Sequence, residues 1–355
     1  IYQTASFSHI KTGHNDSGFD YTRESNPTRQ RLEEIVSSLE SAAGTTAFSS
    51  GMAAISACFE LFAPGDHIIC SEDLYGGVIR LHNLISRKND LTIDYTDTTN
   101  LETVCAAIKA NTKAIYVETP SNPMMNITDL RKCAAIAHTH GLLLIVDNTF
   151  LSPYFQNPLS LGADIVIHSG TKFLSGHNDT VAGFASAKDQ TLADKIRLIS
   201  KTTGGVLSPF DSWLVMRGIK TLPIRMERQQ ESTEKIVAWL LEQPQVEKVF
   251  YPGLKNHPGY TVNEGQASGS GSMISFRVDS KETALRLLQK VKIVTFAESL
   301  GGTESLLTYP ALQTHLDVPA EIRERLGITD TLLRMSVGLE NADDILSDLK
   351  QALEV

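Results

Sequence analysis

Lys172 ends the motif Ser169-Gly170-Thr171-Lys172, which directly follows an apolar run at 165–167. A second apolar run, 142–146, ends at Asp147. Pyridoxal phosphate (PLP) requires a lysine amine for its covalent attachment, an acid facing its ring nitrogen and donors for its phosphate. A lysine and two hydroxyls at one strand end, with an aspartate at another, could supply all three. The alternative is a surface lysine and a solvated aspartate, and these residues alone leave both interpretations open.

A turn of small residues at 49–51 precedes a helical pattern that begins near Gly51 and Met52. Free N–H groups at a helix N-terminus form an anion site, although taken alone this segment is more typical of a simple tight turn into a helix. In an open parallel sheet, ligands bind at the carboxyl ends of the strands. We therefore predict that this turn joins Ser169, Thr171 and Lys172 in a phosphate site.

Three further residues belong to or follow apolar runs. Tyr75 follows the run 67–70, where a phenol could stack on a pyridine ring and transfer protons; the alternative is a core tyrosine. Asn122 follows the run 114–118. Arg334 lies inside an apolar segment, and a buried guanidinium requires an anion. That anion is either a substrate carboxylate or the partner in an internal salt bridge.

The elements that must position these residues alternate between β-rich runs and helical patterns from about 49 to 187. This alternation predicts an α/β fold with a mainly parallel sheet and helical crossovers. A first helix is expected to begin at Asn26-Pro27, with Asn26 as the N-cap, and another within 129–140 is capped by Thr128 or Asp129. The strand candidates are 67–70, 91–95, 114–118, 142–146, 165–168 and 183–187.

The chain divides into three predicted parts. Residues 1–24 show little periodicity and are expected to form an extended arm, 25–218 a cofactor-binding domain and 219–355 a smaller α/β domain. A long helical region around Trp213 leads into the last part. Its strand candidates are 273–278 and 333–337, and its helix candidates are 281–291 and 343–353.

Length and composition exclude several classes of protein. A chain of 355 residues suggests about two domains. The net charge is −9, from 32 basic and 41 acidic residues, which argues against a nucleic-acid or membrane partner. The four cysteines show no CxxC spacing and favour buried free thiols in the cytoplasm over disulfides or a metal site. Since the chain begins at Ile1 without an initiator methionine or signal peptide, we expect a missing N-terminal piece.

Taken together, the motifs resemble the cystathionine-metabolism (Cys/Met metabolism) family of fold-type I PLP-dependent enzymes. The resemblance is greatest to the cystathionine γ-synthases and γ-lyases, and it covers essentially the whole chain. It implies a seven-stranded type of sheet in the cofactor domain and a homotetramer built from dimers that share active sites. The matching motifs lie at 21–28, 49–52, 75–77, 146–149, 169–172 and 298–302.

The resemblance also implies a role for each site residue. Lys172 would attach the cofactor and move the substrate's α-proton, Asp147 would pair with the ring nitrogen, and Tyr75 would stack on the ring. The substrate would be held by Asn122, Ser299 and Arg334, with Arg334 gripping the α-carboxylate. The phosphate would be bound by Gly51, Met52, Ser169 and Thr171, together with Tyr21 and Arg23 of the neighbouring subunit.

A few positions bear on the reaction. Methionine γ-lyases carry a cysteine where this chain has Gly77, which counts against that activity. Arg80 and Glu298 match residues that bind the distal end of the substrate in γ-acting members, although either could be an ordinary solvated side chain. Glu24 stands where enteric γ-synthases have an arginine, which argues against a succinylated substrate. Segments 208–213 and 308–315 are most similar to γ-synthases that also accept sulfide.

We therefore predict a cytoplasmic transsulfuration enzyme of methionine and cysteine metabolism. Its expected reaction is γ-replacement on an O-acylhomoserine by cysteine, as in cystathionine γ-synthase. The alternatives are elimination from cystathionine, as in the γ- and β-lyases, and a regulatory PLP-binding protein without turnover. The sequence leaves open the acyl group, the β or γ cleavage preference and the pH optimum.

Overall fold

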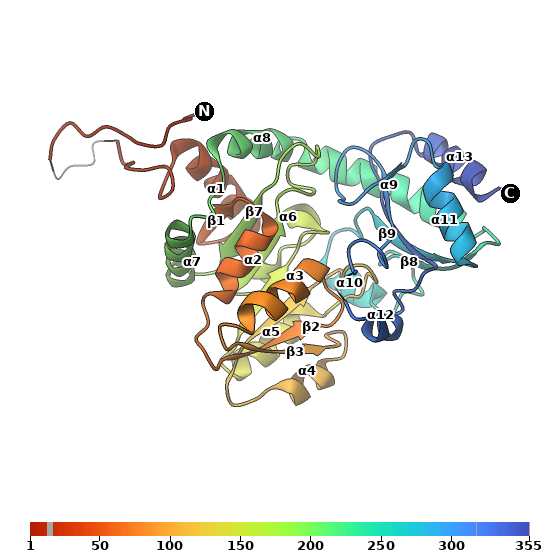
Figure 1. Ribbon diagram of the computed structural model, residues 1–355, viewed down its shortest axis with the longest axis horizontal. Helices are drawn as coiled ribbons and strands as arrows, with labels where there is room; N and C mark the ends of the chain where they lie inside the picture. The colour runs from red at the N-terminus through yellow and green to blue at the C-terminus, as the bar shows by residue number, and fades with distance from the viewer. Residues whose placement is uncertain (13–16, 317, 355) are drawn as a thin grey trace.

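The computed structural model describes residues 1–12, 17–316 and 318–354. Two sheets lie side by side, each with its own helices, and an extended N-terminal segment projects from the larger part (Figure 1). The predicted α/β class is confirmed. The larger sheet has seven strands in the order β1-β7-β6-β5-β4-β2-β3.

Five neighbouring strands of the larger sheet, from β6 to β3, are parallel, whereas β7 pairs antiparallel with both β6 and β1. The prediction of a mainly parallel sheet is therefore confirmed. Only β1 was missing from the predicted strands of this sheet. The strands are β1 (Gly44–Phe48), β2 (His67–Ser71), β3 (Thr92–Thr96), β4 (Thr112–Glu118), β5 (Leu143–Asp147), β6 (Ile165–Ser169) and β7 (Gly183–Ala187).

Helices cover both faces of this sheet because alternate strand residues point to opposite sides. Ile145 of β5 joins the core beneath α2, α3 and α7, while Leu144 and Val146 join the core beneath α4 and α5. The helices of this part are α1 (Pro27–Glu40), α2 (Gly51–Phe59), α3 (Gly76–Leu81), η1 (His82–Ser86), α4 (Leu101–Ala107), α5 (Leu130–Thr139), α6 (Ser152–Phe155), η2 (Pro158–Leu161), α7 (Gln190–Thr203) and α8 (Pro209–Ile219).

Side-chain caps fix where three of these helices begin. The Asn26 side chain accepts a hydrogen bond from the Thr28 N–H at 2.9 Å, as predicted. Asp129, rather than Thr128, caps α5 by accepting from the Lys132 N–H at 3.1 Å. Ser50 caps α2 by accepting from the Ala53 N–H at 3.0 Å. Because each cap satisfies an N–H that lacks an intrahelical partner, it sets the first residue of its helix.

The smaller sheet has five strands in the order β10-β11-β12-β9-β8 and packs against α9, α11 and α13. The predicted helical region around Trp213 is α8, which ends at Ile219, and the long helix α9 that follows was not predicted. Pro223 occupies the first turn of α9, where a proline is tolerated. The remaining elements are α9 (Leu222–Leu240), β8 (Val246–Phe250), α10 (Tyr260–Gln266), β9 (Met273–Val278), α11 (Lys281–Lys290), β10 (Thr295–Phe296), β11 (Leu306–Thr308), α12 (Ala320–Leu326), β12 (Leu332–Ser336) and α13 (Ala342–Leu353).

One expectation about the cysteines was wrong. Cys58, Cys70 and Cys133 are buried, but Cys105 is exposed. It lies on α4, a short helix in which Val104 is the buried residue. Cys105 is the next residue along the helix, so its side chain points away from the buried side. All four cysteines are free thiols.

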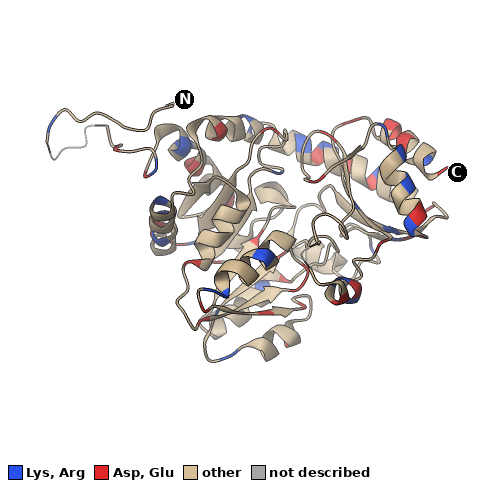
Figure 2. Cartoon of the chain, in the orientation of Figure 1, with Lys and Arg blue, Asp and Glu red and all other residues tan. Residues whose placement is uncertain are grey.

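Charged residues of both signs alternate along α9 and α11 (Figure 2). This distribution is typical of solvated helix faces and gives these helices no extended basic surface. Within the described part of the chain, no helix combines the length and apolarity needed to cross a membrane.

Candidate active site

The carboxyl ends of β4, β5 and β6 meet at one edge of the larger sheet, beside the smaller sheet. Glu118 ends β4 and lies opposite Asp147 in the ladder, and Ser169 ends the next strand. A cavity of about 250 Å³ opens at this edge. All predicted site residues line it except Tyr21, Arg23 and Arg80.

Lys172 lies in the turn after β6, and its Nζ donates a hydrogen bond to Ser299 Oγ at 2.9 Å. The pKa of this ammonium is lowered to about 8, mainly by burial and also by the nearby Arg334 charge, while Glu298 acts in the opposite direction. A larger fraction of the side chain is therefore the free amine near neutral pH than in an ordinary lysine. The free amine is the form that attacks a carbonyl carbon.

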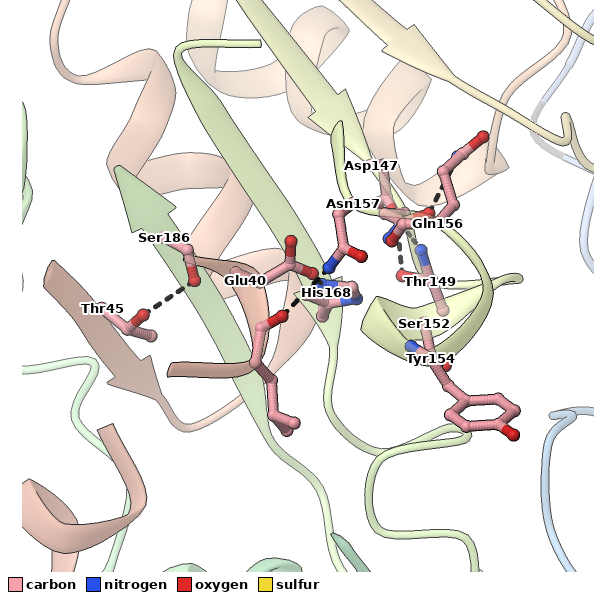
Figure 3. Close-up of polar contacts among 12 residues, drawn as sticks. Glu40, Thr45, Asp147, Thr149, Ser152, Tyr154, Gln156, Asn157, His168 and Ser186 are labelled. Carbon is pink, nitrogen blue, oxygen red and sulfur yellow. Dashed lines mark hydrogen bonds and ion pairs between the residues drawn. The ribbon is translucent and has the colours of Figure 1, made fainter. Parts of the chain in front are cut away.

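Asp147 is buried and held by three donors. Its Oδ1 accepts from the Thr149 N–H at 3.0 Å and from the Thr149 hydroxyl at 2.6 Å (Figure 3), and its Oδ2 accepts from the Tyr116 hydroxyl at 3.4 Å. Burial raises the pKa of Asp147, whereas the bonds from Thr149 and the nearby His168 lower it. These donors offset part of the cost of burying a carboxylate, which can then face a protonated ring nitrogen.

Glu118 is a second buried carboxylate in the same wall. Its Oε2 accepts from the Tyr75 N–H at 3.0 Å. Burial is the main cause that raises the pKa of Glu118 well above its usual range, and the nearby Asp147 carboxylate raises it further. Two buried acids with raised pKa values therefore lie at adjacent strand ends, and groups with shifted pKa values cluster at functional sites.

The predicted phosphate site is where α2 begins against the end of β6. A Cβ on Gly51 would lie 3.0 Å from Ser169 Cβ and 3.1 Å from its Cα, so only glycine allows this close approach. The N–H groups of Gly51 and Met52 are the first two of the helix and have no partners within it. Thr171 Oγ donates to the Ala182 carbonyl at 3.2 Å and accepts from the Ala182 N–H at 3.0 Å. Its hydroxyl proton would have to rotate away from Ala182 to reach a phosphate.

The Tyr75 ring folds over the first turn of α3 at the mouth of the cavity, and its side chain is 39% exposed. A Cβ on Gly77 would lie 2.4 Å from Tyr75 Cε1 and 3.1 Å from Met52 Sδ. Gly77 thus leaves room for the ring in this position. A cysteine at residue 77 would force the ring or Met52 to move.

Arg334 is buried in the middle of β12, and among the described residues its hydrogen-bond acceptors are uncharged. Nη1 donates to Asn122 Oδ1 at 2.8 Å, and Nη2 donates to the Ser299 carbonyl at 3.2 Å and to Thr308 Oγ at 3.3 Å. Nε is buried without a partner in this part of the chain. Burial lowers the pKa of the guanidinium to about 10, while Glu118 and Glu298 act to raise it. A carboxylate ligand would satisfy both the charge and the open donor.

The segment 298–302 closes the cavity from the smaller sheet. Ser299 has a φ of 98°, a strained value for a residue with a side chain. A Cβ on Gly301 would lie 2.8 Å from the Phe173 nitrogen, so this segment approaches the Lys172 turn closely. Glu298, next to Ser299, is exposed and lines both the main cavity and a neighbouring one.

Three predicted site residues lie elsewhere in the chain. Arg80 is exposed in the last turn of α3. Tyr21 and Arg23 line a separate pocket with Gly204 and Val206, and Arg23 donates to the Lys201 carbonyl. Their roles toward cofactor and substrate remain predictions.

Sequence reasoning missed Glu118, Thr149 and Thr314, which also line the cavity. Glu118 could have been found, because it ends an apolar run in the same way as Asp147. Thr149 lies within the Asp147-Asn148-Thr149 motif. Thr314 follows the short strand β11 in an irregular segment, where no local pattern marked it as part of the site.

The residues present fit PLP. A buried acid, a lysine with a lowered pKa, a glycine at a helix N-terminus and an unsatisfied arginine Nε surround one cavity. Lys172 would hold the cofactor, Asp147 would face its ring nitrogen, and the first turn of α2 would face its phosphate.

Comparison with known proteins finds relatives that match along almost the whole chain. The chain is 49% identical over 354 residues to a cystathionine gamma-lyase of Bacillus subtilis, covering 100% of this chain and 93% of that protein. It is 46% identical over 354 residues to a cystathionine beta-lyase of Lactococcus lactis, with the same coverage. It is 49% identical over 354 residues to a cystathionine gamma-synthase of Haemophilus influenzae, covering 99% of this chain and 91% of that protein.

Among solved structures, a cystathionine gamma-lyase from Lactobacillus plantarum, complexed with L-serine, matches with a TM-score of 0.96 and 42% identity. The match covers 99% of this chain and 92% of that one. The family described as Cys/Met metabolism PLP-dependent enzymes matches residues 1–354. The chain is therefore a member of the Cys/Met metabolism family of PLP-dependent enzymes.

Proposed function

We propose that this PLP-dependent transsulfuration enzyme catalyses γ-replacement on an O-acylhomoserine, with cysteine as the incoming nucleophile and cystathionine as the product. The alternative of a non-catalytic PLP-binding protein is set aside by its membership of this enzyme family. The observation that carries the γ-specific proposal is Glu298, an exposed carboxylate on the cavity wall beside Ser299. The resemblance assigns this position to γ-acting members.

The proposed roles follow from the geometry around the cavity. Arg334 would bind the α-carboxylate through Nε and place the substrate's α-carbon near Lys172. When bound, PLP supplies an electron sink that stabilises negative charge on that carbon. Lys172 would remove the α-proton, because a lowered pKa leaves its amine free to accept it. Once that proton has been released to the bound cofactor, the amine would be free again to accept a β-proton. Loss of the γ-substituent would follow.

Glu298 would recognise the ammonium of the distal amino acid. In γ-replacement that ammonium belongs to the incoming cysteine, and in cystathionine cleavage it belongs to the leaving half. The Glu298 carboxylate attracts this ammonium, and the attraction is stronger in a partly dehydrated cavity than in water. Cysteine and cystathionine are therefore both favoured over a ligand whose distal end is a neutral acyl chain. The relatives named as synthases, γ-lyases and β-lyases are similarly close, so the identities do not choose among these reactions.

We further propose a cytoplasmic homotetramer built from dimers with shared active sites. Support comes from Tyr21 and Arg23, which lie in a pocket apart from that of Lys172. The free thiols of Cys58, Cys70 and Cys133 support a reducing compartment.

The deciding experiment is a kinetic comparison on one enzyme preparation. O-Acetyl- and O-succinylhomoserine are each supplied with cysteine, and cystathionine is supplied alone. We expect kcat/KM for acetylhomoserine plus cysteine to exceed that for cystathionine cleavage. The reverse order would identify a lyase, and the products (cysteine with 2-oxobutanoate, or homocysteine with pyruvate) would then distinguish γ- from β-elimination. Lys172→Ala serves as the inactive control.

A further inference from the structure

His315 lies in the segment that follows β11, and none of the roles described above involves it. Its side chain is 1% exposed. Nε2 lies 3.0 Å from the backbone carbonyl oxygen of Asn122, and Nδ1 lies 2.8 Å from Thr314 Oγ. The imidazole thus joins a loop of the smaller sheet to the loop that follows β4 of the larger sheet.

The bonding partners specify the tautomer of this ring. The Leu74 carbonyl also lies near the ring, but the Asn122 carbonyl oxygen lies 3.0 Å from Nε2. A carbonyl oxygen can only accept, so we assign the proton to Nε2. Burial, together with the nearby Arg334 charge, lowers the pKa of His315 to about 4, so the ring is neutral at physiological pH. In a neutral ring Nδ1 is an acceptor, and the Thr314 hydroxyl therefore donates to it.

Asn122 is consequently fixed through two different groups. His315 holds its backbone carbonyl, while its side-chain oxygen accepts from Arg334 Nη1 at 2.8 Å. The same part of the smaller sheet also contacts the Tyr75 turn: a Cβ on Gly76 would lie 2.3 Å from the Thr314 carbonyl oxygen. A shift of His315 would therefore move the residue that orients the guanidinium.

We propose that His315 is a positioning residue for α-carboxylate recognition: its Nε2–H holds the Asn122 carbonyl, and Asn122 in turn holds Arg334 in the orientation that binds an amino acid. This rests on the proposed role of Arg334. His315 does not touch the substrate. Its loss would weaken ground-state binding rather than slow proton transfer at Lys172, so KM would rise while kcat changed little.

The test compares His315→Leu, which removes the donor, with His315→Gln, whose amide can replace the Nε2–H. His67→Leu is the matched control. His67 is equally buried and also has two partners, with Nδ1 2.8 Å from Thr112 Oγ and Nε2 3.2 Å from Asp94 Oδ2. It lies at the amino end of β2, away from the cavity. The probe is L-serine, titrated into each holoenzyme by calorimetry, with thermal unfolding of each variant measured in parallel.

We expect the Kd for L-serine to rise about tenfold in His315→Leu, which corresponds to about 1.4 kcal/mol, and to return to within about threefold of the parent in His315→Gln. His67→Leu should lose thermal stability without a change in Kd. An unchanged Kd in His315→Leu, or an equal rise in His67→Leu, would overturn the proposal.

A second measurement detects the protonation of His315 in the parent protein, and a variant serves only to assign the signals. In holoenzyme labelled with ¹⁵N-histidine, we expect His315 to show a protonated Nε2 and an unprotonated Nδ1 between about pH 6 and 8, its signals assigned by their loss in His315→Gln. A proton on Nδ1 instead would contradict the proposal, since Nε2 could not then donate to Asn122. A wrong role for Arg334 would give a different result. Arg334→Gln would then bind L-serine as tightly as the parent, while His315 would still show the expected tautomer.

Discussion

At the scale of single residues, the site is governed by the charges around one amine. Lys172 lies between Arg334, which lowers its pKa, and Glu298, which raises it, and burial contributes the largest lowering. Only the free amine attacks the cofactor's aldehyde, so capture of PLP should accelerate as the pH rises through about 8. The neighbours of Lys172 should therefore shift this pH profile in opposite directions.

The first prediction tests that opposition in cofactor-free protein. Arg334→Gln removes a cation that disfavours the ammonium, so the pKa of Lys172 should rise and PLP capture should require a higher pH. Glu298→Gln removes an anion that favours the ammonium, so the profile should move to lower pH. The measurement is the initial rate of PLP uptake against pH, followed by absorbance. Borohydride reduction and peptide mapping should place the label on Lys172, and a label on another lysine would reject the assignment.

The second prediction concerns substrate choice by Glu298. Glu298→Gln should lower kcat/KM for cystathionine by roughly 10- to 100-fold, equivalent to about 1.4–2.8 kcal/mol, because its distal group is cationic. For an acetylated homoserine without an added thiol the loss should be smaller, since its distal group is neutral. Arg80→Ala is measured alongside, as the predicted contact for the distal carboxylate. If neither variant altered the preference among substrates, a β-lyase would become the better assignment.

At the scale of elements, α13 fixes the chain just before the segment 298–302. Asp348 is buried, and its carboxylate accepts from the N–H groups of Lys292, Ile293 and Val294 at 2.8–3.0 Å. These residues lead directly into β10, and Glu298 follows two residues after that strand. One side chain of α13 therefore holds the backbone that places Glu298 and Ser299 at the cavity.

The third prediction is that Asp348→Asn lowers the free energy of unfolding by about 2–4 kcal/mol. The substitution removes the charge that strengthens these hydrogen bonds. It also places the NH₂ group of the asparagine against backbone N–H groups, to which it cannot bond. The measurement is the urea midpoint of unfolding at constant m-value. Asp344→Asn is the matched control, because Asp344 lies on the same helix but is exposed, and its loss should cost less than about 1 kcal/mol. Equal losses in the two variants would show that the effect comes from helix charge rather than from the bonds of Asp348.

The elements that could be predicted from the sequence are those whose local pattern agrees with their tertiary setting. The buried parallel strands appear as short apolar runs between turns, and β7 and β9 have the predicted bounds. The short strands β10 and β11 and the half-exposed β8 carry too little pattern to be recognised. Among the residues that line the cavity, most of those within motifs were predicted, although Thr149 was missed. Thr314 and His315 belong to the site through contacts with distant segments, and no local pattern identifies such contacts.

At the scale of the whole molecule, the N-terminal segment is the part that one chain alone does not explain. Residues 1–12 and 17–24 extend from the body (Figure 1). They pair with each other through Phe7 N–H to Asp20 O at 3.0 Å and Thr22 N–H to Ala5 O at 2.8 Å. This pairing brings Tyr21 and Arg23 to a pocket separate from that of Lys172. We therefore propose that Arg23 contacts a phosphate in the Lys172 site of a second copy of the chain.

The fourth prediction is that two inactive variants restore activity when they share a dimer. Arg23→Ala should retain PLP roughly tenfold less well or worse, because a charge-assisted contact to phosphate contributes about 1.5–3 kcal/mol. Lys172→Ala should lose turnover entirely.

If each site takes Arg23 from one subunit and Lys172 from the other, a hybrid dimer contains one site with both residues intact. Subunits mixed after mild dissociation, with hybrids isolated by two different affinity tags, should therefore recover activity approaching half of the parent's per dimer. Hybrid dimers that remain inactive would show that each site is built from one chain, and Arg23 would then act only through the Lys201 carbonyl of its own subunit.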